Sequence, residues 1–289
     1  MKKSRTFDVV VIIMFAALAL LTLYPFYNVI ILSFSNTESV AKHIPYLLPF
    51  ALDLTGYKTI IQDSDFINSL LVSLFVTIVG TAVNMVLSVI AAYVLSRKYL
   101  DGRNMIMSVI VFTMLFGGGL VPTYMVIKDM GLINKVWAMI LPTAINTYYL
   151  IIMKNYFLGL PDGLFEAAKL DGAGEWTMLW KVAFPLSKPI MATFTLFYAV
   201  DRWNEWYNAL LYINKKALSP LQIYLRDILT SLNSQLSTQA QQMMGSTQKV
   251  STSAVHMATI VITALPIMLV YPYLQKYFVN GVMVGGIKE

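Results

Sequence analysis

The stretch EAAKLDGAGEW, residues 166–176, decides how this chain folds, because it interrupts a sequence that is otherwise mostly apolar. Its alanines favour a helix, and Gly172 and Gly174 can end that helix with a left-handed turn. After Glu175, apolar residues recur at three- and four-residue spacing, which indicates a second helix. The stretch therefore predicts two short helices joined by a glycine elbow.

The ends and faces of these helices can be predicted too. Asp162 is placed to cap the first helix, and Glu166 lies near its first turn, where the helix dipole favours an acid. Pro185 and Pro189 are expected to stop the second helix. The expected apolar face of that helix consists of Trp176, Leu179, Trp180 and Ala183. Such a segment is either an amphipathic linker on lipid head groups or a projection for a soluble partner. The flat alanine surface and the elbow favour the projection.

The composition of the rest of the chain points to a lipid bilayer. Of the 289 residues, 57% are hydrophobic and only 12% are charged, and the mean hydropathy is +0.65. Soluble domains carry about 25% charged residues. A water-soluble protein of this length could not bury so much apolar surface, so we expect a membrane protein.

Residue content excludes several kinds of site. Cysteine is absent, and the two histidines, His43 and His256, lie far apart, so no metal site is expected. No phosphate-binding Walker A pattern occurs, so we expect no nucleotide or other cofactor on this chain. The basic residues behind the formal charge of +6 are scattered over loops, so nucleic acid is not an expected partner.

Six segments are apolar over about the 20 residues that a membrane-crossing helix needs. They are Val9–Leu32, Phe66–Leu95, Met105–Ile127, Val136–Phe157, Ile190–Ile213 and Ser253–Gln275. The first is read as an uncleaved anchor, because no polar region follows its cleavage-like box. The chain is thus predicted to be an all-α, polytopic protein with six transmembrane helices. Its first part, residues 1–65, holds one helix and an outer loop, and residues 66–289 form the main transmembrane domain.

Basic residues in short loops set the predicted orientation. Lysines and arginines flank the start of the first span and crowd RKYLDGRN, residues 97–104, after the second. Both termini and the loop 158–189 are therefore expected in the cytoplasm of a cell-membrane protein. The loops 33–65, 128–135 and 214–252 are expected outside, and 214–252 reads either as a loop or as a short helix.

The fifth span contains an unusual polar patch, YAVDRWNEWYNALLY, residues 198–212. Charges inside a span are costly and must pair or face water. The candidate substrate-path residues, which could stack on the rings of a substrate or bind its hydroxyls, are Trp203, Asn204, Tyr207 and Asn208. The alternative is an interfacial aromatic belt with an Asp201–Arg202 or interhelix ion pair.

The 166–185 segment resembles a known motif. Glu166-Ala167-Ala168, then Gly172, nine residues, and Val182-Ala183-Phe184-Pro185 is similar to the EAA loop of ATP-binding-cassette (ABC) importer permeases. Val182 and Phe184 replace the isoleucine and leucine of that pattern. The stretches 117–132, 203–210 and 275–289 also resemble the MalG-like permeases of sugar importers. The Gly-Gly-Leu-Val-Pro-Thr-Tyr run, residues 118–124, is similar to the branch that imports complex oligosaccharides and acidic polysaccharide fragments.

This resemblance implies a MetI-like permease fold and a set of partners. The residues that would couple to an ATPase are Glu166, Ala167, Ala168, Asp171, Gly172 and Pro185. The implied partners are a second homologous permease, an ATPase dimer that binds the ATP, an extracytoplasmic sugar-binding protein and the lipid bilayer. The tail residues Gly285, Gly286 and Ile287 would reach toward the ATPase interface. No catalytic role is expected.

Two other classes remain open from the residues alone. An ion-coupled secondary transporter would show two similar halves, and no such repeat is visible. A membrane enzyme would need convergent acids or bases, for which Asp201 and Glu205 are thin support.

Overall fold

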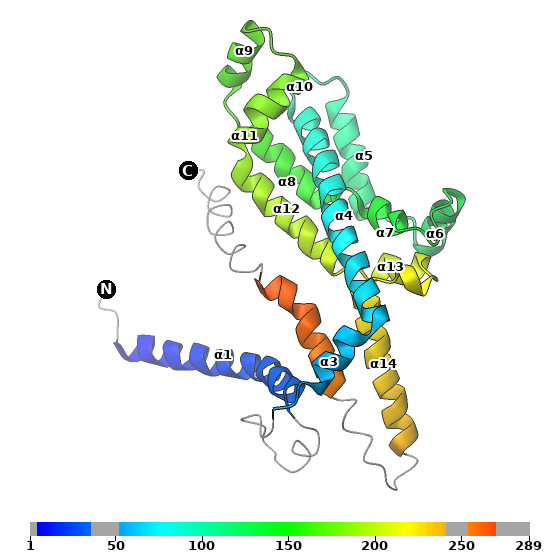
Figure 1. Ribbon diagram of the computed structural model, residues 1–289. Helices are drawn as coiled ribbons and strands as arrows, with labels where there is room; N and C mark the ends of the chain where they lie inside the picture. The colour runs from blue at the N-terminus through cyan, green and yellow to red at the C-terminus, as the bar shows by residue number, and fades with distance from the viewer. Residues whose placement is uncertain (1–4, 36–51, 241–253, 270–289) are drawn as a thin grey trace. The chain divides into compact units, whose positions relative to one another are not determined.

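The structure, a computed structural model, describes residues 5–35, 52–240 and 254–269, with side chains described except for 5–6 and 231–240 (Figure 1). Within these ranges the chain is all-helical, apart from an isolated bridge between Ser35 and Leu52. The predicted all-α class is therefore confirmed for the described residues. The tail 275–289 and His43 lie outside them.

The longer helices, in chain order, are α1 (Arg5–Ser33), α3 (Thr55–Gln62), α4 (Ser64–Ser96), α5 (Arg103–Leu115), α6 (Leu120–Asp129), α8 (Thr147–Leu158), α9 (Asp162–Leu170), α12 (Lys188–Trp203), α14 (Leu221–Ala240) and the unlabelled Ala254–Leu269. The shorter turns are α7 (Trp137–Ile140), η1 (Leu141–Thr143), α10 (Glu175–Met178), η2 (Leu179–Ala183), α11 (Phe184–Leu186), α13 (Tyr207–Tyr212) and η3 (Lys216–Leu218). The segment 214–252 was expected to be either a loop or a short helix. Helix α14 occupies about half of it, so that part is helical.

The chain divides into two compact units. One lies within residues 1–67 and 224–266, and the other is mainly residues 68–223. In the first unit, the Ser33 hydroxyl lies 2.7 Å from the Tyr57 hydroxyl, and Tyr224 donates a hydrogen bond of 2.6 Å to Asp63. The first contact joins the end of α1 to α3, and the second joins α14 to the residue between α3 and α4.

Two helices are long and apolar enough to cross a membrane, namely α1 from Phe7 onward and α4. None of the apolar window of α1 is buried, so its side chains need an apolar solvent. Helices α5 and α6 would make a third crossing if they form one span, but they are bent by 116°. Ala254–Leu269 is a shorter apolar helix within the predicted sixth span.

Three predicted spans are not continuous helices, which corrects the prediction. Met105–Ile127 breaks at three glycines, where Gly119 has φ of 85°. Val136–Phe157 breaks around Pro142, where a 3-10 turn separates α7 from α8. Ile190–Ile213 ends as a helix at Trp203 and resumes at Tyr207. Hydropathy is an average of apolarity over a window of residues, so it does not reveal where a helix breaks within that window.

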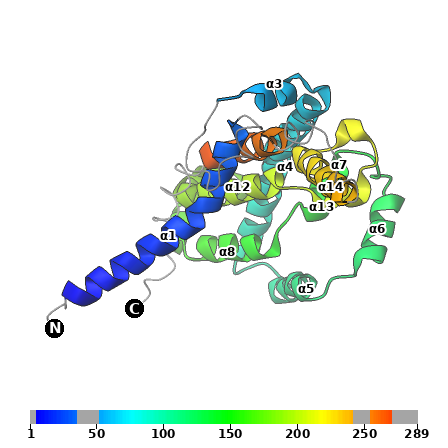
Figure 2. The ribbon, with the colours of Figure 1, turned by 90° about the horizontal axis from the view of Figure 1, so that it is seen from below.

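The core of the second unit lies where α4, α8 and α12 pack together (Figures 1 and 2). Tyr93 of α4 and Phe157 of α8 meet edge to face with ring centroids 6.0 Å apart. Tyr198 of α12 joins all three elements, since its hydroxyl lies 2.7 Å from the Ser88 hydroxyl and accepts from the Asn146 backbone N–H at 3.1 Å. Asn146 caps α8 by accepting from the next turn.

The loops at the two ends of this unit meet in the pairs that the predicted topology requires. At one end, Lys98 forms an ion pair of 2.8 Å with Asp162, joining two segments predicted to be cytoplasmic. At the other end, Asn134 accepts hydrogen bonds from the backbone of Asn214 at 2.6 Å and Lys215 at 3.2 Å, joining two segments predicted to be outside.

Candidate functional site

The glycine elbow is present as predicted. The Gly172 N–H donates to Lys169 O at 3.0 Å and the Ala173 N–H donates to Ala168 O at 2.9 Å, which satisfies the last carbonyls of α9. Gly172 has φ of 80°, a conformation that strains any residue with a Cβ. Helix α9, the elbow and α10 project from one end of the bundle (Figure 1). We call residues 162–183 the hairpin.

One prediction about the hairpin is wrong. Asp162 does not cap α9, because Pro161 occupies the cap position and no side chain bonds there. Asp162 instead accepts a hydrogen bond from Lys98, and this contact lowers the pKa of the Asp162 carboxyl. Pro185 itself lies inside α11, but the helix ends one residue later at Leu186, and Ser187 separates it from α12, so the predicted stop before the fifth span is found.

The predicted apolar face of the second helix is also corrected. Residues Leu179–Ala183 form a π-helical turn, which inserts an extra residue and rotates the faces after it. Leu179 and Ala183 are buried as expected, but Trp176 is 63% exposed and stands away from the core. The simple three- and four-residue spacing could not anticipate this turn.

Arg97, just beyond α4, anchors α9 to the bundle. Its guanidinium carbon lies 3.8 Å from the ring centroid of Phe165 and 4.1 Å from that of Tyr93. Phe165 is buried and Ala168 is half-buried against the core, so α9 is attached to the bundle through this face as well as through the Lys98–Asp162 ion pair. A stacked cation of this kind contributes about 0.5–2 kcal/mol.

Glu175 attaches the second arm of the hairpin to the same end of α4. Its carboxylate accepts hydrogen bonds from Tyr93 at 2.9 Å and from Tyr99, and it lies 3.8 Å from the Lys169 ammonium. Burial alone would raise the pKa of Glu175, but the hydrogen bonds from Tyr99 and Tyr93 hold that pKa below its usual value of 4.5. Burial and the bond to Glu175 raise the pKa of Tyr99 to about 12, so this donor stays protonated.

Most of the predicted coupling residues are exposed on the hairpin. Ala167, Asp171 and Gly172 are exposed, and Ala168 is half-buried against the core of the bundle. Glu166 is exposed too, but it lies at the edge of the free side, because it also lines an open pocket with Arg97 and Lys98. Pro185 is exposed beyond the hairpin, in α11. Leu170, 89% exposed, adds a large apolar side chain to the free side of the hairpin, whose other side is fixed to α4.

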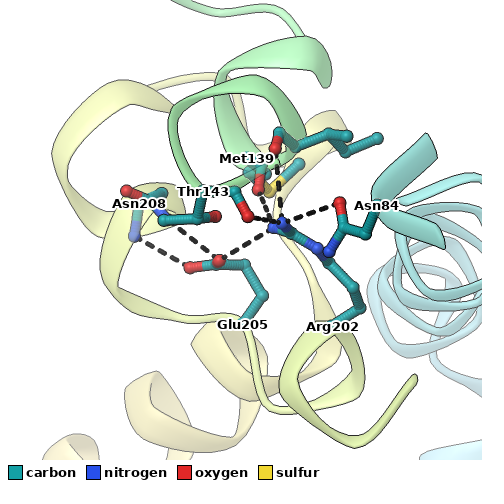
Figure 3. A network of polar contacts seen from close by, with 7 residues as sticks. Asn84, Met139, Thr143, Arg202, Glu205 and Asn208 are labelled. Atoms are coloured by element: carbon teal, nitrogen blue, oxygen red, sulfur yellow. Dashed lines mark hydrogen bonds and ion pairs between the residues drawn. The ribbon is translucent and has the colours of Figure 1, made fainter. Parts of the chain in front are cut away.

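A second polar site lies where α7 and α12 break (Figure 3). The Arg202 guanidinium donates to Met139 O and Thr143 O, each at 2.6 Å, to Ile140 O at 3.3 Å and to the Asn84 side chain at 3.2 Å. Its side chain is 3% exposed and pairs with Glu205 at 3.6 Å. The break at Pro142 leaves carbonyls without helical donors, and one guanidinium satisfies three of them.

Space for Arg202 comes from a glycine on α4. A Cβ at Gly80 would lie 2.9 Å from the Arg202 Cδ. The suggested Asp201–Arg202 pair is therefore wrong: Arg202 pairs with Glu205, and Asp201 accepts from the Tyr149 hydroxyl at 3.1 Å. The role of Asn84 in this network was not predicted from the sequence, in which the only signal of Asn84 is an amide inside an apolar span.

The four predicted substrate-path residues do not share a face, because the helix ends at Trp203. Trp203 is buried, and Asn208 is buried with its amide bonded to Glu205 at 2.9 Å. Asn204 is exposed and bonds back to Val200 O at 3.0 Å. Tyr207 is exposed, so the structure brings only Asn204 and Tyr207 of the four to the surface.

A cavity of about 350 Å³ adjoins the Arg202 network, lined by Asn84, Thr143, Asp201, Arg202 and Glu205 among others. Within the described ranges no group of three or more acids and histidines is placed to hold a metal ion.

The sequence matches a known protein family over most of its length. The profile of the family described as "Binding-protein-dependent transport system inner membrane component" matches residues 9–284. Protein LplC of Bacillus subtilis is 42% identical, over 99% of this chain and 96% of its own. The polygalacturonan/rhamnogalacturonan transport system permease protein YtcP of the same organism is 42% identical over 99% of both chains. The crystal structure of a bacterial ABC transporter involved in the import of the acidic polysaccharide alginate contains a chain that superposes with a TM-score of 0.87 at 32% identity, covering 96% of this chain and 99% of that one.

Proposed function

Because the chain belongs to the family of inner membrane components of binding-protein-dependent transport systems, we propose that it is the permease of an ABC importer for oligosaccharides, coupled to its ATPase through the hairpin. It is a multi-pass membrane protein with the MetI-like permease fold and is not an enzyme. The observation that carries the coupling role is the hairpin itself. Phe165 and Glu175 anchor it to the end of α4, while Glu166 and Ala167 are exposed.

The proposed topology has six crossings with both termini in the cytoplasm. The crossings are α1, α4, the bent pair α5–α6, the broken run α7–η1–α8, the broken run α12–α13, and the helix that includes Ala254–Leu269. Broken helices are tolerated at membrane depth where protein or water satisfies the freed backbone groups, as Arg202 does here. The meeting of Lys98 with Asp162 at one end, and of Asn134 with Asn214 at the other, supports this arrangement.

The proposed coupling works through the hairpin as a rigid connector. An ATPase subunit that binds Glu166 and the small residues around it would pull on α9. The stacked Arg97 and the bonded Glu175 would pass that movement to α4. Each nucleotide state of the ATPase then favours a different arrangement of the helical bundle. Transport follows because a change of nucleotide state shifts the population from one arrangement to another. ATP would be bound by the ATPase subunits, and this chain would need no cofactor of its own.

The proposed cargo is an oligosaccharide, delivered by an extracytoplasmic binding protein to this chain and a second permease. Support comes from the printed names of relatives that are 42% and 32% identical, which concern polygalacturonan, rhamnogalacturonan and alginate. These are acidic or partly acidic polysaccharides, so fragments with uronic acid residues are the favoured class. Of the predicted path residues, Asn204 and Tyr207 are the exposed candidates for contact.

The coupling role can be tested on the purified complex. Glu166→Lys reverses an exposed charge and leaves the anchoring residues Arg97, Phe165 and Glu175 in place, and Asp129→Lys is a matched reversal at the other end of the unit. We expect Glu166→Lys to reduce copurification of the ATPase and its ligand-stimulated hydrolysis, while Asp129→Lys leaves both unchanged. Normal assembly and normal stimulation in Glu166→Lys would remove the proposed coupling role.

A further inference from the structure

The cavity beside Arg202 has the size and lining of a binding site. At about 350 Å³ it falls within the range of ligand pockets, which begins at about 300 Å³. It lies where α7 gives way to η1 and where α12 ends, so two helix breaks border it. Broken helices at membrane depth are found where the chain lines a water-filled cavity or is buried in protein.

Asn84 supplies a hydrogen-bond donor that no described residue uses. The side chain is fully buried, and its Oδ1 accepts from Arg202. Its Nδ2 has no hydrogen-bond partner among the described residues. A buried donor without an acceptor costs about 1–3 kcal/mol. Because Nδ2 is shielded from solvent, a group in the cavity can accept from it, and be stabilised, only after a small movement of the lining.

Asp201 supplies an acceptor on the same cavity wall. One carboxylate oxygen accepts from the Tyr149 hydroxyl at 3.1 Å, which orients the group. The other oxygen accepts no hydrogen bond from the part of the chain that the structure describes. A hydroxyl group, which both donates and accepts, complements this pair of free positions.

The charges of the lining decide against an anion. Arg202 is neutralised by Glu205 and engaged by three carbonyls, so it offers no free positive charge. Asp201 has no such ion pair, so the lining has an excess negative charge. A carboxylate entering the cavity would meet like charge, whereas a neutral hydroxyl would not.

We propose that this cavity binds the hydroxyl groups of a neutral sugar ring, with Asp201 as acceptor and Asn84 as donor, and that it rejects the carboxylate of a uronic acid. The inference rests on the proposed function, an oligosaccharide importer. The inference adds that the cavity in this subunit binds uncharged sugar rings, or the uncharged faces of rings, in the transported oligosaccharide. Carboxylates of the oligosaccharide are then held elsewhere in the pathway.

The test compares two trimers in proteoliposomes that contain the importer and its binding protein. The probes are the trimer of galactose and the trimer of galacturonic acid. Each variant's uptake rate is divided by the wild-type rate for the same trimer, so that selection by the binding protein cancels. Asp201→Asn removes the charge and keeps the acceptor for Tyr149, and Asp129→Asn is the matched control.

We expect Asp201→Asn to lower relative uptake of the galactose trimer about tenfold, the value of one hydrogen bond to a charged group. Relative uptake of the galacturonic acid trimer should fall less or rise, because the repulsion is gone. Asn84→Asp, which keeps an acceptor for Arg202 but loses the donor, should lower uptake of both trimers. Asp129→Asn should change neither.

The outcomes separate this inference from the function on which it rests. Equal effects of Asp201→Asn on the two trimers, or no effect, would overturn the cavity's role while an importer with normal ATPase coupling stands. If the wild type imports neither trimer, the proposed oligosaccharide cargo fails and the inference fails with it. If Asp201→Asn does not assemble with the ATPase, the Asn84→Asp variant decides, since unchanged uptake there would refute a hydroxyl site.

Discussion

Replacing Arg202 with leucine should be among the most damaging single changes in the second unit. Arg202→Leu removes a guanidinium that makes four hydrogen bonds, three of them to backbone carbonyls around the Pro142 break. It also leaves Glu205, whose side chain is only 9% exposed, without its ion partner.

The expected size follows from these losses. Breaking a buried ion pair by removing one partner costs about 3–5 kcal/mol. Each orphaned carbonyl adds up to about 1–3 kcal/mol, although water entering the adjoining cavity can satisfy part of this. We therefore expect Arg202→Leu to lower the free energy of unfolding by about 4 kcal/mol. The double variant Arg202→Leu with Glu205→Leu should regain about 2 kcal/mol, because no unpaired charge then remains.

The assay is unfolding of the purified permease in mixed micelles by titration with SDS, for the wild type, both single variants and the double variant. Trp203→Phe, a change of similar burial next to the network, serves as the packing control. A loss below about 1 kcal/mol for Arg202→Leu, or additive effects in the double variant, would refute the view that this guanidinium holds the broken helices together.

Three further outcomes are expected. Gly80→Ala should destabilise the protein by about 1–3 kcal/mol in the same titration, because its Cβ would lie 2.9 Å from the Arg202 Cδ; wild-type stability would contradict the close approach. Gly172→Ala should weaken the hairpin by about 1 kcal/mol and lower ligand-stimulated ATP hydrolysis, since the φ of 80° disfavours alanine; full stimulation would show that the elbow angle is unimportant. Because the pKa of Glu175 is held below 4.5, its contribution to hairpin stability is present at neutral pH and is lost as the pH falls through the folded-state pKa, below 4.5. The fluorescence of the neighbouring Trp176 should report this acid transition in the wild type and not in Glu175→Gln, and identical titrations would refute it.

The features predicted correctly from sequence are those with strong local signals. The elbow depends on Gly172 alone, whose left-handed φ only glycine adopts readily. Helices α1 and α4 were found because an apolar run of that length can scarcely be anything else. The predicted pairing of loops at the two ends of the second unit is also found, while the side of the membrane that each end faces stays a prediction.

The features that were missed depend on residues far apart in the chain. Arg202 bonds to carbonyls about 60 positions away, so nothing local reveals that it stabilises a break near Pro142. Predicting a continuous fifth helix placed Trp203 and Tyr207 on one face, whereas the break separates them. The π-helical turn at Leu179–Ala183 is equally invisible to a fixed helical period.

The central claim, that the free side of the hairpin contacts an ATPase subunit in the cytoplasm, can be measured with one engineered cysteine. The chain has no cysteine of its own, so Ala167→Cys introduces a unique thiol on the exposed side of α9, and Met130→Cys provides an exposed control at the other end of the unit. A short thiol-to-amine crosslinker applied to membranes should join position 167, and not position 130, to the ATPase. A thiol at 167 that reacts only with reagents outside the cell, or that yields no ATPase product in an assembled importer, would contradict the account.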